Sequence, residues 1–203
     1  MVNWWEKAYR TRWKNMKEKK PRKVVTDFSK KLNKNSRILD LGCGSGRHLR
    51  YLAKKGHFVV GSDISETVLG VAHKKAIEDK LKNYVLLKHD MTDFPFVSNH
   101  FDAILSINVI EHAKLNDIKK SANEIYRTLK KGGLALVTAP STNDEDYKKG
   151  EKVGIREYIV RDHLHHFFNE NDVKHVFSRF KILEMGEESI EGEYTHWRLV
   201  LKK

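Results

Sequence analysis

Short apolar runs rich in Val, Ile and Leu recur along this chain, and several segments between them carry apolar residues at every third or fourth position. The short runs are typical of buried β-strands, and the longer period is typical of helices with one apolar face. The pattern therefore predicts seven strands, at residues 37–41, 58–61, 84–88, 101–107, 134–139, 180–187 and 195–201.

Helices are predicted between and before these strands. Trp5, Tyr9, Trp13 and Met16 form one apolar stripe, which predicts an N-terminal helix over residues 4–19. Further helices are predicted at residues 27–32, 47–55, 66–79 (with Ser65 as its cap) and 169–177, and one with Ile118, Ala122, Ile125 and Leu129 on its inner face and Gly132 and Gly133 at its end. Residues 141–168 are polar and without a clear period, so no element is predicted there.

Alternating strands and helices indicate βαβ units. The expected fold is therefore α/β, a single Rossmann-like domain whose mostly parallel seven-stranded sheet has helices on both faces and an antiparallel C-terminal strand. A length of 203 residues suits one such domain. A ligand site is expected where the parallel strands end.

The chain carries a net charge of +12. An acidic partner such as RNA is one interpretation, and a lysine-rich surface that follows genome composition or growth temperature is the favoured one, because the lysines are scattered. The densest basic stretch contains Arg10, Arg12, Lys14, Lys17, Lys19, Lys20, Arg22 and Lys23.

Cys43 is the single cysteine, so no disulfide forms within the chain and no cluster of cysteines can bind zinc or iron–sulfur centres. This composition suits a reducing cytoplasm. The first residues lack the pattern of a signal peptide, and no apolar run approaches the length of a membrane span, so no membrane association is expected.

The strongest local motif is a glycine-rich turn after the first predicted strand. It places Asp40 at the strand end, followed by Gly42, Gly44 and Gly46, before a helix begins at Arg47. Glycines there permit positive φ and close approach of a ligand to the backbone, and the helix N-terminus offers free N–H groups. A carboxylate in such a turn attracts an ammonium group and repels a pyrophosphate. A tight structural turn is the alternative.

Two more acidic residues follow the next two predicted strands. Asp63 can accept hydrogen bonds from both hydroxyls of a ribose, or can cap the next helix. Asp90 can accept one from an adenine amine while Met91 packs on the ring, although Asp90 alone reads as a loop residue. Acidic residues at three successive strand ends favour a nucleoside-containing ligand.

In these stretches the chain resembles the class I S-adenosylmethionine-dependent methyltransferases, in particular the small domains of the Methyltransf-11 and Methyltransf-25 type and the tellurite-resistance-type enzymes. The resemblance rests on ILDLGCGSGRHLRYLAKKG, VVGSDIS, LKHDMTDFPF, HFDAILSINVIEH and LKKGGLALVTAP, and is strong over residues 34–140. It implies S-adenosyl-L-methionine as cofactor. The residues it assigns to the cofactor are Asp40, Gly42, Gly44 and Gly46 for methionine and ribose, Asp63 with Ile64 for the ribose, Asp90 and Met91 for adenine, and Asn108 for methionine.

The Trp5 and Tyr9 pair is similar to a Trp-x-x-x-Tyr element that covers the cofactor in related enzymes; a helix docked on the sheet is an equal alternative. We therefore expect a lid over residues 1–33, a cofactor core over 34–140 and a substrate-side segment over 141–203. Weak candidates for acceptor contacts are Tyr147, Arg161, His163, His165 and His166. The histidines of this segment could bind a metal or act as a general base. A structural or substrate-contacting role is favoured, and no metal site is expected, because no HxxxH pair and no cysteine partner supports one.

The predicted function is methyl transfer to a nucleophile, most simply on a small molecule, with no catalytic residue assigned. Alternatives are an RNA or protein acceptor, as the charge allows, and a non-catalytic S-adenosylmethionine-binding module. An NAD-dependent oxidoreductase is disfavoured because the turn reads Gly-x-Gly-x-Gly, with Arg47 where the nicotinamide pattern needs glycine. The segment 106–109 also lacks the Asp/Asn-Pro-Pro-aromatic motif of amine methylators.

Overall fold

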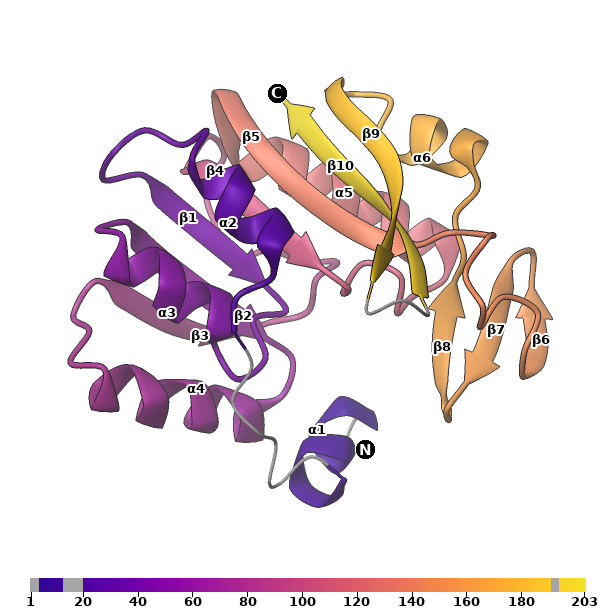
Figure 1. Ribbon diagram of the computed structural model, residues 1–203, viewed down its shortest axis with the longest axis horizontal. Coiled ribbons are helices and arrows are strands. Elements are labelled where there is room, and N and C mark those ends of the chain that lie inside the picture. The colour runs from indigo at the N-terminus through magenta and orange to yellow at the C-terminus, as the bar shows by residue number, and fades with distance from the viewer. Residues whose placement is uncertain (1–3, 13–19, 191–193) are drawn as a thin grey trace.

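A computed structural model describes residues 4–12, 20–190 and 194–203 of the protein. Its centre is one seven-stranded sheet with the order β3-β2-β1-β4-β5-β10-β9 (Figure 1). The strands are β1 (Arg37–Leu41), β2 (Phe58–Asp63), β3 (Tyr84–Lys88), β4 (Phe101–Ile107), β5 (Leu129–Pro140), β9 (Lys181–Ile190) and β10 (Tyr194–Lys202). Strand β10 alone runs antiparallel to the other strands of this sheet, since it pairs antiparallel with both β5 and β9. The predicted α/β fold is thereby confirmed.

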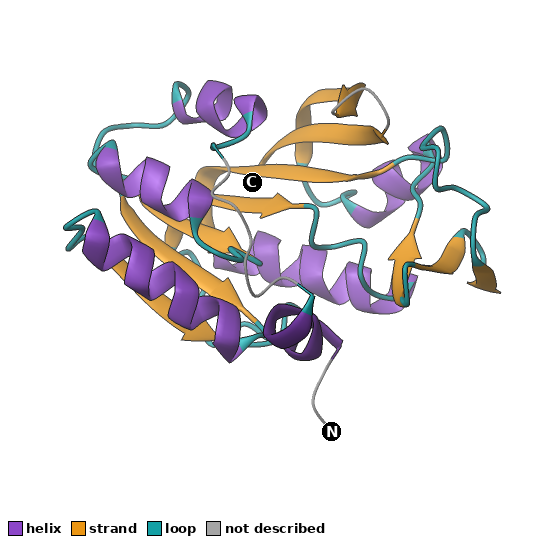
Figure 2. Cartoon of the chain, turned by 60° about the horizontal axis from the view of Figure 1, so that its bottom comes forward, coloured by secondary structure: helices purple, strands orange, loops and turns teal. Residues whose placement is uncertain are grey.

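Helices cover both faces of this sheet (Figure 2). Apolar residues of α2 (Lys23–Ser29) and α3 (Arg47–Lys54) pack on one face, and those of α5 (Leu115–Thr128) and α6 (Glu170–Val176) pack on the other. Successive strand residues alternate between these cores: Ile38 belongs to the first and Leu39 to the second. Helix α4 (Glu66–Glu78) runs beside β2 and β3, and Ser65 caps it by accepting a hydrogen bond from the Val68 N–H.

Helix α1 (Trp4–Thr11) stands apart from the sheet and contacts α4 (Figure 1). The prediction had placed this helix over residues 4–19, and Trp13 and Met16 of its apolar stripe lie outside the described residues. Among the residues that are described, no helix is both long and apolar enough to cross a membrane.

Two helix boundaries differ from the predictions. The helix expected at 27–32 is α2, which begins earlier, at Lys23. Leu129 is wrongly placed in a helix by its spacing: its backbone is already extended, and it begins β5 with a fully buried side chain. Leu129 follows the apolar spacing of the helix because its side chain is buried, although its backbone is not helical. The pairing of β5 with β4 then jumps from Leu129 to Leu134, so the predicted glycine stop lies in this irregular stretch.

The largest difference lies in residues 141–168, where no element was predicted. This segment holds a three-stranded antiparallel sheet of β6 (Glu151–Gly154), β7 (Glu157–Val160) and β8 (His163–His166). Each strand has only four residues, and the β7–β8 turn uses Arg161 and Asp162, both at positive φ. Such turns usually carry Asn-Gly, Asp-Gly or Gly-Gly, and Arg161-Asp162 matches none of these pairs, so the sequence signal was missing.

Candidate active site

The glycine-rich turn leaves the end of β1 and enters α3 with Gly42, Gly44 and Gly46 all at positive φ. At Gly42 a side chain would also have no room, because a Cβ there would stand 2.3 Å from a methyl group of Val109. Gly46 forms the N-cap of α3 in the left-handed conformation. The turn therefore brings bare backbone to the carboxyl edge of the sheet, as a ligand-cradling loop requires.

Asp63, at the end of β2, is tied to this turn. Its carboxylate accepts the N–H of Gly44 at 3.0 Å and the N–H of Ser65 at 3.0 Å, so it joins the turn to the start of α4. Burial raises the pKa of Asp63, and the backbone hydrogen bonds oppose that shift. Asp63 therefore accepts a hydrogen bond at the start of α4, as the alternative interpretation predicted, and it also lines a cavity.

Asp40 lies beneath the turn. The side chain is 1% exposed, and its carboxylate accepts the N–H of Leu49 at 3.0 Å within α3. Burial raises the pKa of Asp40 to about 7. The Asp40 carboxylate therefore links β1 to α3. Asp40 does not line the cavity described next.

A cavity of about 490 Å³ opens where β1, β2, β3 and β4 end. Eight of the eleven predicted cofactor residues line it, whereas Asp40, Gly44 and Gly46 do not: the eight are Trp5, Tyr9, Gly42, Asp63, Ile64, Asp90, Met91 and Asn108. Asp90 is exposed and accepts hydrogen bonds from the backbone and hydroxyl of Thr92, the arrangement of a loop. The structure therefore brings the predicted residues of four strand ends and of the N-terminal helix together.

Helix α1 reaches this cavity because Glu6 anchors it to the start of α4. The Glu6 carboxylate accepts hydrogen bonds from the Ser65 hydroxyl at 2.6 Å and from the backbone N–H of Thr67 at 3.2 Å, and it pairs with Arg10 at 2.8 Å. A carboxylate at a helix N-terminus also gains from the helix dipole. These bonds lower the pKa of Glu6 to about 2. Glu6 was not predicted as a site residue, because its partners Ser65 and Thr67 are about sixty residues away in the sequence.

Replacing Glu6 with glutamine is expected to loosen α1 by about 1–3 kcal/mol, because glutamine keeps the size and loses the charge-assisted bonds. Hydrogen exchange of residues 4–12 should rise, while the melting temperature of the core changes little. In the wild-type protein, α1 docking should be constant above about pH 4.5, the ordinary pKa of the group, and weaken as the pH falls toward about 2. The matched control is Glu66→Gln, which replaces an exposed carboxylate at the start of α4. Equal exchange in both variants would contradict the anchor.

A second cavity, of about 550 Å³, adjoins the first. The two share four lining residues: Trp5, Tyr9, Asn108 and His112. The second cavity is closed on its far side by the small sheet and β10, through residues such as Arg161, His163, His165 and His196. Three of the five predicted acceptor-side residues therefore line it.

The other two, Tyr147 and His166, lie elsewhere. His166 is fully buried, with Nε2 3.5 Å from Asp172 and Nδ1 3.8 Å from Glu157. Tyr147 packs against Tyr158 and Phe167 of the small sheet. Both hold that sheet together, away from the cavity wall.

Asn108 has a fixed position between the cavities. It follows β4 at positive φ, and its side-chain oxygen accepts hydrogen bonds from Arg22 at 3.0 Å, from the Thr138 hydroxyl at 2.8 Å and from His196 Nδ1 at 3.2 Å. Three donors on one oxygen set the orientation of the amide. The wall of the second cavity also carries Arg12, Arg22, Arg161, Asp144 and Asp146, and it includes Glu111, whose pKa burial raises to about 8.

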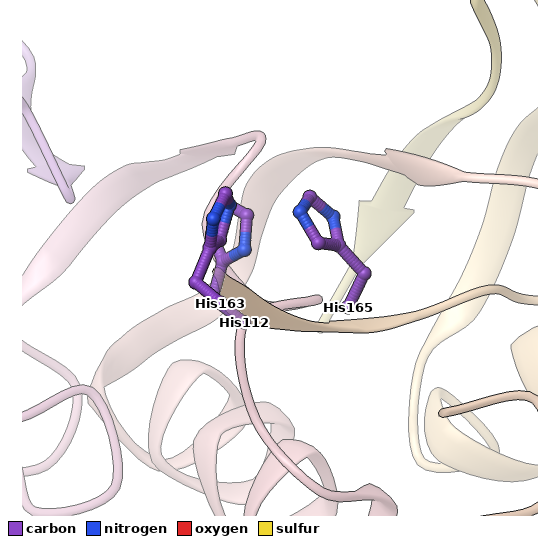
Figure 3. Close-up of side chains that lie close together, drawn as sticks. All are labelled: His112, His163 and His165. Atoms are coloured by element: carbon purple, nitrogen blue, oxygen red, sulfur yellow. The ribbon is translucent and has the colours of Figure 1, made fainter. Parts of the chain in front are cut away.

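Three histidines meet at this wall: His112, from the loop after β4, and His163 and His165, from β8 (Figure 3). Burial lowers the pKa of all three, that of His165 to about 3, so the rings are neutral near pH 7. His163 and His165 were predicted as weak acceptor contacts, whereas His112 was not predicted. A strand assignment for β8 would have placed the first two on one face, because strand side chains alternate.

Comparisons with known proteins agree with this arrangement. Residues 38–133 match the family model described as a methyltransferase domain. The tRNA (carboxymethyluridine(34)-5-O)-methyltransferase alkbh8 of Xenopus tropicalis is 30% identical over 134 residues, 66% of this chain and 20% of its own length. The ubiquinone biosynthesis O-methyltransferase of Pelagibacter ubique is 32% identical over 129 residues, 61% of this chain and 52% of its own.

Among solved structures, a SAM-dependent methyltransferase from Methanosarcina mazei superposes with a TM-score of 0.77 at 20% identity, covering 91% of this chain and 99% of that one. This likeness establishes a shared fold. The chain spans about half or less of the length of the two curated relatives.

Proposed function

We propose that the chain transfers the methyl group of S-adenosyl-L-methionine to a nucleophilic atom of a small-molecule acceptor, as expected of a chain whose residues 38–133 match a methyltransferase domain. The observation that carries the proposal is the pair of cavities that share Trp5, Tyr9, Asn108 and His112. A cofactor in the first cavity with its sulfur near these residues would present its methyl group to the second.

In the proposed complex the cofactor lies across the strand ends. Asp63 accepts the ribose hydroxyls with lone pairs that the Gly44 and Ser65 N–H groups leave open, and Asp90 and Met91 meet the adenine. The turn at Gly42 and the Asn108 loop hold the methionine end. Of the N-terminal residues expected to form a lid, helix α1 covers the first cavity, whereas α2 packs on the sheet as part of the core, and Asp40 supports the turn from below.

The second cavity supports a small acceptor. Its volume of about 550 Å³ lies within the range typical of small-molecule sites. Its wall carries Asp144 and Asp146 beside its arginines, and these carboxylates disfavour a phosphate backbone, which needs a continuous positive groove. The segment 141–203 supplies much of this wall, as a substrate-side segment should.

Methyl transfer requires little of the protein beyond positioning the acceptor and the cofactor. The sulfonium carbon is already activated, so alignment of the acceptor in line with the S–CH₃ bond and exclusion of water supply the acceleration. The O–CH₃ or N–CH₃ bond forms as the S–CH₃ bond breaks, S-adenosylhomocysteine leaves with both electrons of that bond, and the proton of the acceptor passes to solvent. The aromatic residues Trp5 and Tyr9 exclude water from the meeting point.

Calorimetric titration tests the cofactor half of the proposal. We expect stoichiometric binding of S-adenosylhomocysteine and no heat from NAD, because the turn reads Gly-x-Gly-x-Gly and has Arg47 where the nicotinamide pattern needs glycine. Transfer of labelled methyl groups to small phenols, amines and carboxylates, with tRNA as the competing acceptor, tests the other half. Tight NAD binding without a response to S-adenosylhomocysteine would refute the enzyme class. If only tRNA were labelled, the acceptor would be tRNA and not a small molecule.

A further inference from the structure

The three histidines at the cavity wall form a compact cluster. One ring nitrogen from each of His112, His163 and His165 lies within 4.8 Å of the other two. The ring centroids are 4.2 Å apart for His163 and His165, 4.8 Å for His112 and His165, and 5.0 Å for His112 and His163. In Figure 3 all three rings stand on the same side of β8.

Hydrogen bonds leave one nitrogen of each ring available as a ligand. Nδ1 of His112 contacts the Leu164 carbonyl at 3.2 Å, and Nδ1 of His163 contacts the Arg161 carbonyl at 3.1 Å. A carbonyl oxygen only accepts, so these Nδ1 atoms carry the hydrogen and a neutral ring keeps its lone pair on Nε2. Nε2 of His165 is buried and has no hydrogen-bond partner in the described part of the chain. Donation from the second ring nitrogen to a backbone carbonyl is the arrangement that surrounds histidine ligands of metals.

We propose that His112, His163 and His165 bind a divalent transition-metal ion of the zinc class, with its remaining coordination position open to the second cavity. Three protein ligands and one open position are the pattern of catalytic rather than structural zinc. Nitrogens about 2.0–2.1 Å from a tetrahedral ion lie about 3.3 Å apart. The rings therefore need to close in by about 1.5 Å at most, through side-chain rotation.

The ligand set selects the metal. Imidazole nitrogens suit Zn²⁺, Cu²⁺, Ni²⁺ and Fe²⁺, whereas Mg²⁺ and Ca²⁺ require oxygen ligands. Glu111 is the carboxylate next to the cluster, with Oε1 3.7 Å from His112 Nε2, and its Oε2 is buried without a partner among the described residues. One carboxylate beside three imidazoles still favours a transition metal.

The metal gives the acceptor cavity a specificity, and this step alone rests on the proposed function. An acceptor hydroxyl that binds the open position loses its proton to solvent more readily, because the ion stabilises the oxyanion. The oxygen then forms its bond to the methyl carbon as the S–CH₃ bond breaks. A phenol or another hydroxyl compound that can reach the ion is the acceptor class that fits.

The test uses untagged, chelator-treated protein and Co²⁺, whose visible absorption reports tetrahedral nitrogen coordination. We expect one Co²⁺ per chain, displaced by Zn²⁺, and a higher melting temperature with either ion. His163→Gln and His165→Gln should each weaken binding by at least roughly 100-fold, since even outer-shell partners of a metal site are worth 10- to 100-fold. His175→Gln, at an exposed residue of α6, should bind as the wild type does.

Circular dichroism of the His163 and His165 variants, which should match that of the wild type, shows that a loss of metal binding does not come from unfolding. The proposal fails if the wild type binds no ion stoichiometrically, or if both variants bind Co²⁺ as tightly as the wild type. A thiolate charge-transfer band would also overturn it, by moving the ion to Cys43. Metal binding is measured without turnover, so its failure leaves the methyltransferase proposal standing.

Discussion

Replacing Gly42 with alanine is expected to weaken S-adenosylhomocysteine binding by at least roughly 100-fold and to lower the free energy of unfolding by about 2–4 kcal/mol. The backbone at this position has a φ of +62°, which disfavours any Cβ, and the added atom would stand 2.3 Å from Val109. The turn must shift, and with it the backbone at the cavity. Calorimetry measures the affinity, and urea unfolding measures the stability.

A second substitution separates the two causes. Val109→Ala in the Gly42→Ala background removes the methyl groups at 2.3 and 2.7 Å but leaves the φ unchanged. We therefore expect stability to recover in part and affinity to remain low. Gly70→Ala, in α4 where an added Cβ meets no atom within 4 Å, is the control. Normal affinity in Gly42→Ala would mean that the turn does not cradle the cofactor.

Replacing Asp63 with alanine is expected to reduce cofactor affinity by roughly 10- to 150-fold, corresponding to about 1.5–3 kcal/mol for charge-assisted hydrogen bonds to a ribose. The same variant loses the bonds to Gly44 and Ser65, so part of the loss could come from a distorted turn. Affinity alone does not separate these causes.

A cofactor analogue that lacks the ribose hydroxyls resolves them. If Asp63 holds the ribose, the analogue should bind the wild type much more weakly than S-adenosylhomocysteine, and Asp63→Ala should bind both ligands alike. If Asp63 only shapes the turn, removing the hydroxyls should cost the wild type and the variant the same factor. The second outcome would contradict the ribose assignment. Circular dichroism of both proteins checks that the fold persists.

The sheet and its order of elements were predictable because burial on two faces leaves a repeating signal. Residues such as Ile38 and Leu39 have to be apolar to serve both cores, and the glycines after them have to be small. Parallel strands also end at one edge, so Asp63 and Asp90 could be expected at one cavity before any coordinates were known.

The acceptor side could not be predicted in the same way. Strands β6, β7 and β8 are held by a small cluster of Tyr158, Val160 and Phe167, too few residues to impose a period. His112 and His163 are neighbours only because the loop after β4 meets β8, a contact that no spacing in the sequence encodes. For the same reason Glu6 gave no sign of its role.

Because the two cavities share a wall, binding of a ligand in one cavity affects binding of a ligand in the other. Any adjustment of Trp5, Tyr9, Asn108 or His112 that accompanies the filling of one cavity alters the other, so each ligand changes the other's dissociation constant by the same factor. An acceptor that needs the cofactor to order this wall would bind second, and S-adenosylhomocysteine would then leave last. Product inhibition by S-adenosylhomocysteine, competitive toward the cofactor and noncompetitive toward the acceptor, is the kinetic signature of that order.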